Sequence, residues 1–470
     1  MATISKNLFW SLITSVLQLY TGSIVFIALA KLMAVEDFGI LSFGFSLSAL
    51  AVIVADFGFS LMVIKDYPKQ GDQSGKYLAN SLLSKMVLAA VSGIFFYIYL
   101  LLFYNGQWLQ VGGLYLVFAV VASFTIYLQS LLKVQNRFNK YTESNLVYAL
   151  AVTISVVLYW HLKLSLLQLV LCLLAAKAMQ LLWTTVLCKF DFIKFSYDGK
   201  LMGKLLKNSW SFGVFGILGI FYFMVDTQII SVYLGAKEVA LYQAVFRIIL
   251  ILMVFSDIMS NVLLPYLSFK FFNKENVGEL VSKLFLYLLI IGCSLFLAFT
   301  SFKTEVLTLL YTQEYQEAAA LVLPFSIVVI LRTVSTLLGN ILTISNKQVY
   351  RVITVSVSLF VSLLLNLICI PKYGILAAAW ISVLVHLILF GMYFAYSRIE
   401  VPSIELHSLS NLFLVAVTII IYGMIHHVTS GGLWIVLGCA ALWLLTVFGI
   451  MRQGNNLDFL KQVLREKGVG

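Results

Sequence analysis

Long apolar runs separated by short polar connections dominate the chain. Fourteen runs reach the roughly 20 residues that an α-helix needs to cross about 30 Å of hydrocarbon. They cover residues 8–32, 39–64, 77–104, 109–134, 143–162, 164–188, 208–234, 239–268, 280–300, 321–344, 349–370, 374–396, 409–427 and 432–451. Because a backbone in lipid must satisfy its own hydrogen bonds, such runs cross as helices. The pattern predicts an all-α polytopic membrane protein with about 14 transmembrane helices.

The connections between the runs are short. The two longest, residues 189–207 and 301–320, are typical of amphipathic surface helices, and no connection is long enough to form a separate soluble domain. Only 11% of the residues are charged, against about 25% in soluble domains. The five cysteines are odd in number and have neither disulfide-framework nor metal-ligand spacing. Composition thus excludes an ordinary soluble protein.

The basic residues are distributed unevenly between the two sides of the predicted membrane. With a cytoplasmic N-terminus, 22 Lys and Arg residues fall on the cytoplasmic side and 5 on the other. Basic connections stay in the cytoplasm, so we expect both termini there. The net charge of +11 is explained by this topology and does not require a nucleic-acid partner.

The chain shows weak internal similarity at a shift of 201 residues. This shift places residues 36–40 over 237–241 and Asp56 over Asp257. It predicts two six-helix halves, residues 1–190 and 191–400, followed by two additional helices and a tail in residues 401–470. Both halves would enter the membrane in the same direction, as parallel repeats around a central cavity. Chance self-similarity among fourteen spans is the alternative.

Several motifs, in order and spacing, carry a resemblance to a known family. They are Glu36-Asp37-Phe38-Gly39, Asp56-Phe57-Gly58, Val225-Asp226-Thr227-Gln228-Ile229-Ile230, Leu234-Gly235-Ala236-Lys237-Glu238-Val239-Ala240-Leu241-Tyr242, Tyr311-Thr312-Gln313-Glu314-Tyr315 and Asn366-Leu367-Ile368-Cys369-Ile370-Pro371-Lys372-Tyr373-Gly374-Ile375. The chain resembles the polysaccharide-transporter branch of the multidrug/oligosaccharidyl-lipid/polysaccharide exporter (MOP) superfamily, the O-antigen flippases. The likeness covers roughly residues 7–400. Ala240 and Ala377 stand where this family often has glycine.

The resemblance implies a flippase of the bacterial inner (cytoplasmic) membrane. Such a protein moves undecaprenyl-pyrophosphate-linked oligosaccharide repeat units to the periplasmic leaflet during O-antigen and lipopolysaccharide biosynthesis. It implies alternating access, coupling to H⁺ or Na⁺, no other cofactor and no catalytic residue. A polysaccharide polymerase and a chain-length regulator are the protein partners that it suggests.

Seven charged residues lie inside the predicted spans and more than four residues from either end, where each charge costs about 2.5–3.5 kcal/mol on insertion scales. Asp226 and Arg247 lie ten or eleven residues from the turn between neighbouring spans, so they are expected at similar depth. If their helix faces agree, they form either a structural ion pair or a protonatable gate. In the second interpretation, protonation of Asp226 frees Arg247 for an anionic substrate.

Three other bases are candidate substrate contacts. Arg332 and Lys177 lie near the centres of their spans with no acid one helical turn away. A guanidinium offers bidentate contacts to a pyrophosphate, which favours Arg332 as a substrate ligand. Lys85 lies about a third of the way into its span and could instead extend to the cytoplasmic edge.

The remaining candidates concern coupling and gating. Asp56 and Asp257 occupy equivalent positions of the repeat and are expected to gate the inner face, to carry the coupling ion or to support helix packing. His386 lies near the middle of its span, where it either relays protons or is simply hydrogen-bonded.

Missing motifs narrow the function further. The chain has no G-x-x-x-x-G-K-[ST] phosphate-binding loop and no H-E-x-x-H motif, so we expect a secondary transporter and not an ATPase or a metalloenzyme. Two alternatives stay open. A cation or drug exporter of the same superfamily would need more buried acids, and a polysaccharide polymerase or ligase would need a larger outer loop.

Overall fold

The described part of the protein is helical throughout its regular elements. A computed structural model describes residues 2–69, 74–188, 197–273, 277–404, 409–427 and 432–453. Within these ranges, ten helices are long and apolar enough to cross a membrane, and two shorter apolar helices follow near the C-terminal end. The predicted all-α polytopic fold is confirmed.

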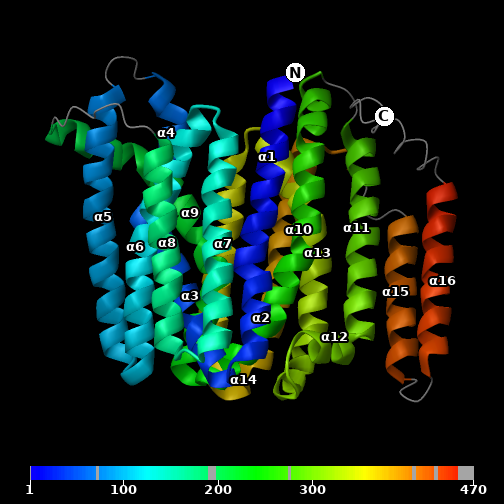
Figure 1. The fold of residues 1–470 in the computed structure, drawn as a ribbon. Helices are drawn as coiled ribbons and strands as arrows, with labels where there is room; N and C mark the ends of the chain where they lie inside the picture. Colours follow the sequence, from blue (N-terminus) through cyan, green and yellow to red (C-terminus); the bar gives the residue numbers. More distant parts are fainter. Residues whose placement is uncertain are drawn as a thin grey trace. The chain divides into compact units, whose positions relative to one another are not determined.

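The first half of the chain forms a bundle of long helices (Figure 1). Its elements are α1 (Ala2–Leu19), η1 (Tyr20–Ile24), α2 (Val25–Leu32), α3 (Val35–Asp56), α4 (Phe59–Asp66), η2 (Tyr67–Lys69), α5 (Ser74–Phe103), α6 (Gly106–Val134), α7 (Phe138–Leu162), α8 (Leu166–Cys188) and α9 (Gly199–Tyr233). The first predicted span therefore contains one turn of π-helix, η1, between two α-helices. Helix α3 lies at the centre of this bundle, where it contacts α5, α6 and α9.

The second predicted span, residues 39–64, is interrupted by a backbone break that the hydrophobic pattern did not predict. Phe57 and Gly58 both adopt left-handed conformations, with φ values of 42° and 79°. A Cβ at Gly58 would lie 2.5 Å from the Gly213 nitrogen on α9, so only glycine allows this approach. The break ends α3 at Asp56 and redirects the chain into α4.

The second half continues with α10 (Ala236–Phe272), α11 (Val277–Ser301), α12 (Lys303–Leu310), η4 (Gln313–Ala318), α13 (Ala319–Ile344), α14 (Gln348–Glu400), α15 (Leu409–His427) and α16 (Gly432–Gln453). Helix α14 covers two predicted spans. Gly374 interrupts it with φ 69° and ψ −161°, at the boundary that the sequence predicted. The connection over residues 301–320 forms the short helices α12 and η4. Residues 199–207 belong to the long helix α9, so no separate surface helix forms there.

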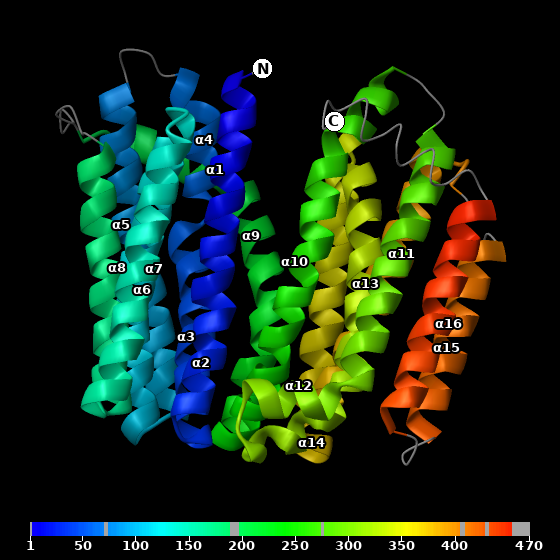
Figure 2. The same ribbon diagram turned by 45° about the vertical axis from the view of Figure 1, so that its right-hand side comes forward.

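Two compact units account for the contacts along the chain. The first contains residues 1–247, 310–315 and 359–378, and the second contains residues 248–309, 316–358 and 379–470. The boundary falls inside α10 and not at residue 190, because α9 packs against α3, α4 and α5. In the second unit, α11 contacts α13 and α15, and α15 and α16 lie side by side (Figure 2). The repeat-based division at residues 190 and 400 stays a prediction.

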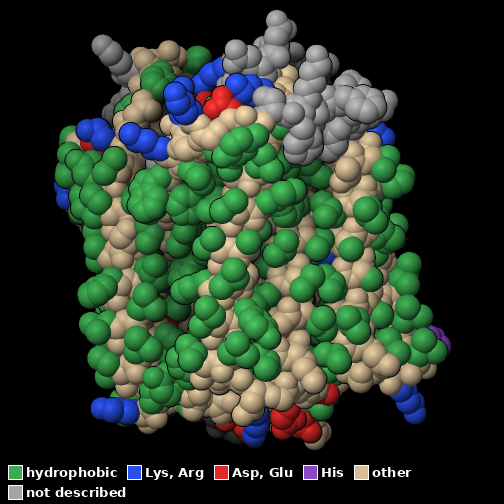
Figure 3. Space-filling model, turned by 90° about the vertical axis from the view of Figure 1, so that its left-hand side faces the viewer, with side chains coloured by type: hydrophobic (Ala, Val, Ile, Leu, Met, Phe, Trp, Pro, Cys, Tyr) green, Lys and Arg blue, Asp and Glu red, His purple; other side chains and the backbone are tan. Residues whose placement is uncertain are grey.

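The surface of the protein matches a membrane environment. Figure 3 shows hydrophobic side chains over the broad middle of one face, whereas Lys, Arg, Asp and Glu side chains gather at its upper and lower edges. Among the described residues, large apolar side chains such as Ile94, Leu102 and Leu182 are exposed on the surface. A multi-pass membrane protein explains this distribution, because lipid covers the apolar band.

Candidate functional site

Asp226 lies in a polar cluster that joins three helices of the first unit. On α9, its Oδ2 accepts a hydrogen bond from the Tyr242 hydroxyl of α10 at 3.0 Å. Its Oδ1 accepts from the Asn366 side-chain amide of α14 at 2.8 Å, and the Ser362 hydroxyl lies 3.5 Å away. Asn366 Nδ2 also contacts Ser362 Oγ, whereas Asn366 Oδ1 is buried without a hydrogen-bond partner. The cluster thus contains a carboxylate and an unused carbonyl oxygen close together.

The expected meeting of Asp226 with Arg247 is not found among the described contacts. The hydrogen bonds Tyr242–Asp226 and Gln243–Thr227 fix the register of α9 and α10. In that register Arg247 lies about 7 Å farther along α10 than Tyr242 and about 140° around the helix. It therefore points away from Asp226. The two residues therefore do not form the expected ion pair in this conformation, and the gating role of Asp226 stays a prediction.

Arg247 instead reaches the π-helical turn η1. Its Nη1 donates to the carbonyl of Gly22, and its guanidinium lies over the rings of Phe26 at 4.0 Å and Phe45 at 4.7 Å. The side chain is only 3% exposed, and its Nε is buried without a hydrogen-bond partner. Among the described residues it has no carboxylate within ion-pair distance. A buried, permanently charged group with unused donors is thus present in the first unit.

Lys177 is a second cation of the first unit that the described residues do not pair with a carboxylate. Its Nζ donates to Gln180 Oε1 at 2.8 Å and lies over the Tyr148 ring at 3.6 Å and the Phe118 ring at 5.3 Å. These contacts attract a cation through the aromatic quadrupole but leave the charge uncompensated. The role of Lys177 as a substrate contact stays a prediction.

Lys85 and Asp56, which the sequence did not connect, form a buried ion pair. Lys85 Nζ lies 2.6 Å from Asp56 Oδ1, and the lysine side chain is fully buried. Asp56 also accepts hydrogen bonds from the Ser60 hydroxyl at 2.5 Å and the Ser60 backbone nitrogen at 3.3 Å. Lys85 therefore does not extend to the membrane edge as one alternative expected. Its carboxylate partner fits a structural role better than a substrate contact.

The other candidates lie in the second unit. Arg332 lies on α13 and His386 on α14. The His386 ring donates from Nδ1 to the Ser382 carbonyl at 2.8 Å, which fixes this tautomer. The side chain of Asp257 lies outside the described residues. Among the side chains that are described, no group of three or more His, Cys, Asp or Glu residues could hold a metal ion.

Three of the motifs that carry the family resemblance meet in the first unit. Gly39 on α3 approaches the turn before α10 so closely that a Cβ would lie 1.9 Å from the Ala236 carbonyl oxygen. The Phe38 ring packs edge-on against Tyr315 with centroids 6.1 Å apart. Tyr311 donates to the Ala244 carbonyl at 2.8 Å. In these contacts the motifs hold helix ends together through a close backbone approach, a ring contact and a hydrogen bond.

Sequence reasoning missed several residues around the buried charges. Ser358, Ser362 and Asn366 recur every fourth residue in an apolar span and are all buried, a spacing that places polar groups on one helix face. This stripe could have identified the partners of Asp226. The Gly22 carbonyl gave no such signal, because a π-helical turn has no clear sequence pattern. Turns of this kind often occur at functional sites.

Comparison with known proteins identifies the class and then the family. The fold is that of transporters of the MOP superfamily. It is similar to the structure "Lipid II flippase MurJ, inward closed conformation", with a TM-score of 0.75, 14% identity and coverage of 95% of this chain and 98% of that chain. It is also similar to an inward-facing multidrug resistance MATE family transporter, with a TM-score of 0.66, 12% identity and coverage of 83% and 96%.

The chain belongs to the family described as "Polysaccharide biosynthesis protein", whose model matches residues 4–271. A relative in Haloferax volcanii, described as "Probable low-salt glycan biosynthesis flippase Agl15", is 24% identical over 357 residues, which is 74% of each chain. The uncharacterized membrane protein MJ1068 of Methanocaldococcus jannaschii is 27% identical over 244 residues, covering 48% of this chain and 47% of that protein. The resemblance stated from the motifs is confirmed at the level of the family, and the fold agrees with that of the MOP superfamily.

Proposed function

We propose that this protein is a flippase for lipid-linked oligosaccharides. It moves undecaprenyl-pyrophosphate-linked repeat units from the cytoplasmic to the periplasmic leaflet of the bacterial inner membrane by alternating access, with both termini in the cytoplasm. The family match and the description of the Haloferax relative as a glycan biosynthesis flippase support this proposal. The MurJ-like fold supports a transport cycle of the same general kind.

The observation that carries the proposal is the environment of Arg247. A guanidinium deprotonates only at extreme pH, so the neighbouring rings and the Gly22 carbonyl surround a fixed positive charge. The free energy cost of this charge falls when an anion with several acceptor oxygens arrives. A pyrophosphate matches both the charge and the unused N–H groups. We assign Arg247 and Lys177 of the first unit to headgroup binding, and we assign Arg332 of the second unit separately as a substrate ligand.

The exporter alternative receives less support from the same residues. A cationic drug would require carboxylates that are available to pair with it, but Asp56 is already paired with Lys85. Arg247 and Lys177, which pair with no carboxylate in the described part of the first unit, would repel such a substrate. The buried charges therefore favour an anionic substrate over a cationic one.

Coupling to an ion gradient belongs to the same proposal. Asp226 and the unused Asn366 Oδ1 offer two oxygen atoms to a Na⁺ ion, or a carboxylate to a proton. Binding there would affect the helices α9, α10 and α14 at once, because Tyr242, Ser362 and Asn366 all contact Asp226. Such a contact set can link occupancy of the site to a change in helix packing.

Headgroup binding is tested with purified protein in proteoliposomes that contain a fluorescent undecaprenyl-pyrophosphate-linked glycan. An impermeant quencher reports how much of the lipid has changed leaflets. We expect Arg247→Gln to lower the rate by about tenfold or more, because one charge-assisted bidentate contact contributes about 1.5–3 kcal/mol. Arg398→Gln is the matched control, since Arg398 is exposed at the end of α14.

A second arm uses cells that lack their own flippase. Arg332→Gln and Arg247→Gln should insert into the membrane at normal levels and fail to restore surface polysaccharide. The lipid that accumulates on the cytoplasmic face of such cells should be the oligosaccharide-pyrophosphate-polyprenol. Full restoration by either variant would remove that arginine from the proposed mechanism. Accumulation of no lipid-linked sugar would contradict the proposed substrate class.

A further inference from the structure

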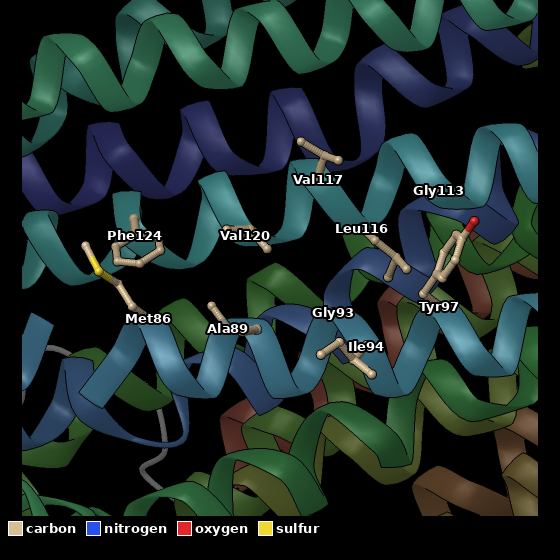
Figure 4. Close-up of a pocket in the computed structure, with 11 residues that line it drawn as sticks. Met86, Ala89, Gly93, Ile94, Tyr97, Gly113, Leu116, Val117, Val120 and Phe124 are labelled. Atoms are coloured by element: carbon tan, nitrogen blue, oxygen red, sulfur yellow. The ribbon is translucent and has the colours of Figure 1, made fainter. Parts of the chain in front are cut away.

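An apolar groove runs along the membrane-facing side of α5 and α6 in the first unit. It has a volume of about 680 Å³. Figure 4 shows Met86 and Phe124 at one end of the groove and Tyr97 and Gly113 at the other. The buried side chains of Ala89 and Leu116 form its floor. No charged side chain lines it, so the groove is suited to hydrocarbon along its whole length.

The walls of the groove repeat with the period of the helix. On α5 the wall residues Met86, Ala90, Gly93 and Tyr97 are three or four positions apart. On α6 the same spacing relates Gly113, Val117, Val120 and Phe124. The two rows run antiparallel, so successive levels of the groove are about 5.4 Å apart. From Met86 to Tyr97 the groove extends about 16 Å along α5.

Two glycines leave notches in these walls. A Cβ built on Gly93 or on Gly113 would meet no atom within 4 Å, so open space lies over both positions. A polyprenyl chain carries a methyl branch on every fourth main-chain carbon. Four carbon–carbon bonds of about 1.5 Å span about 5 Å in an extended chain, so neighbouring branches are about 5 Å apart. This repeat is close to the helical turn of about 5.4 Å. An unbranched acyl chain has no feature with that period.

The charges at one end of the groove also suit an anionic lipid. Lys76 lies ten residues before Met86 on α5, and Lys133 lies nine residues after Phe124 on α6, so both are about 14–15 Å beyond the same end. Lys76 pairs with the partly exposed Asp198 at 2.7 Å, a contact that a lipid phosphate would have to share or replace. Lys65 on α4 is exposed as well. A lipid whose phosphates lie among these lysines would place its chain in the groove, which is continuous with the lipid-facing surface of the spans.

We propose that the α5–α6 groove binds the polyprenyl chain of the lipid-linked substrate. This inference rests on the proposed flippase function and names a site for the lipid tail whose lining residues do not include Arg247 or Lys177. Three isoprene units fill the groove from Met86 to Tyr97, and their methyl branches occupy the notches at Gly93 and Gly113. The groove thereby selects polyprenyl lipids from the phospholipids around them.

The first test identifies the lipid in the groove. The photoreactive residue benzoylphenylalanine replaces Val117 in the full-length protein, which is reconstituted in phospholipid vesicles containing a small fraction of undecaprenyl phosphate. Val157→benzoylphenylalanine is the control, since Val157 is an exposed apolar residue on α7. After illumination, mass spectrometry measures polyprenyl and phospholipid adducts. We expect the ratio of polyprenyl to phospholipid adducts to be about tenfold higher at Val117 than at Val157. Equal ratios at the two positions would overturn the proposal.

The second test measures the effect on transport. Gly93→Leu and Gly113→Leu fill the notches without a clash, and Gly391→Leu is the control because Gly391 is an exposed glycine on α14 with open space around it. We expect the groove variants to raise the KM for the undecaprenyl-linked glycan by about fivefold to tenfold at unchanged kcat, since uniform binding is lost. The KM for a farnesyl-linked analogue, too short to reach from the lysines through the groove, should not change.

The outcomes separate this inference from the proposed function. An equal rise in KM for the long and the short substrate, or no rise for either, would contradict binding of the chain in the groove while leaving the flippase function intact. If the wild-type protein moves neither substrate, the proposed function fails. The ratio of adducts at Val117 then still decides whether the groove prefers a polyprenyl chain.

Discussion

The buried ion pair between Lys85 and Asp56 makes the sharpest prediction about stability. The two charged atoms lie 2.6 Å apart, and the lysine and aspartate side chains are 0% and 8% exposed. At an effective dielectric constant of about 20, their attraction is about 6 kcal/mol, which offsets the cost of removing both ions from water. Lys85→Met removes the attraction but leaves the Asp56 carboxylate buried.

The expected loss of stability follows from what remains around Asp56. Breaking one side of a buried ion pair costs about 3–5 kcal/mol. The Ser60 hydroxyl and backbone nitrogen still donate to Asp56, which places the loss near the lower end, at about 3 kcal/mol. For a chain of 470 residues this corresponds to a fall in Tm of about 3–5 °C. The double variant Asp56→Asn/Lys85→Met removes both charges and should recover most of this loss.

The assay is thermal unfolding followed by intrinsic fluorescence in detergent micelles, for the wild type, both single variants and the double variant. The control is Lys76→Met, because Lys76 pairs with Asp198 at the similar distance of 2.7 Å but with both side chains partly exposed. We expect that control to change the Tm by less than about 1 °C. Single variants as stable as the wild type, or a double variant as unstable as the singles, would refute the reasoning. Normal flipping by the double variant would confirm that Lys85 is not a substrate contact.

Three further predictions follow from single positions. Gly39→Ala should lower stability by about 1–3 kcal/mol in the same unfolding assay, because its Cβ would lie 1.9 Å from the Ala236 carbonyl oxygen. An unchanged Tm would show that the start of α3 and the turn before α10 can move apart with no loss of stability. Gly58→Ala should lower stability by at least about 1–2 kcal/mol, because of its φ of 79° and because its Cβ would lie 2.5 Å from the Gly213 nitrogen. Gly93→Ala, in a helix with open space around it, should raise stability by about 0.5–1 kcal/mol, and the same sign for both variants would contradict this reasoning. Asp226→Asn keeps a hydrogen-bond acceptor for Tyr242 and Asn366 but removes the negative charge. The rate of flipping in proteoliposomes should then no longer respond to imposed Na⁺ or proton gradients. An intact response would exclude Asp226 as the coupling group.

The amphipathic and apolar patterns predicted the helices well because membrane spans are encoded locally. A run of about 20 apolar residues defines a span whatever surrounds it, so the boundaries of α5, α6, α7 and α8 agree with the prediction within a few residues, apart from the earlier start of α7. The break at Gly374 was also visible, because Pro371 and Gly374 interrupt the run. The break at Phe57 was not, because a left-handed phenylalanine depends on its contacts and not on its type.

The partners of the buried charges could not be predicted in the same way, and the two carboxylate–base pairs show why. Counting residues from a turn gives the depth of a side chain, and this count placed Asp226 and Arg247 at the same level. It would have placed Asp56 and Lys85 equally close, on α3 and α5. Of the two pairs, only Asp56 and Lys85 are in contact. Which side chains touch depends on the register between two helices and on the direction that each helix face points. Register and facing are set by packing between helices, such as the close approach of Gly39 to Ala236, and not by the pattern within one span. The sequence alone therefore shows that the Arg247 charge has a high free energy cost inside a span. Its contact with the Gly22 carbonyl in the π-helical turn can be seen only in the folded chain.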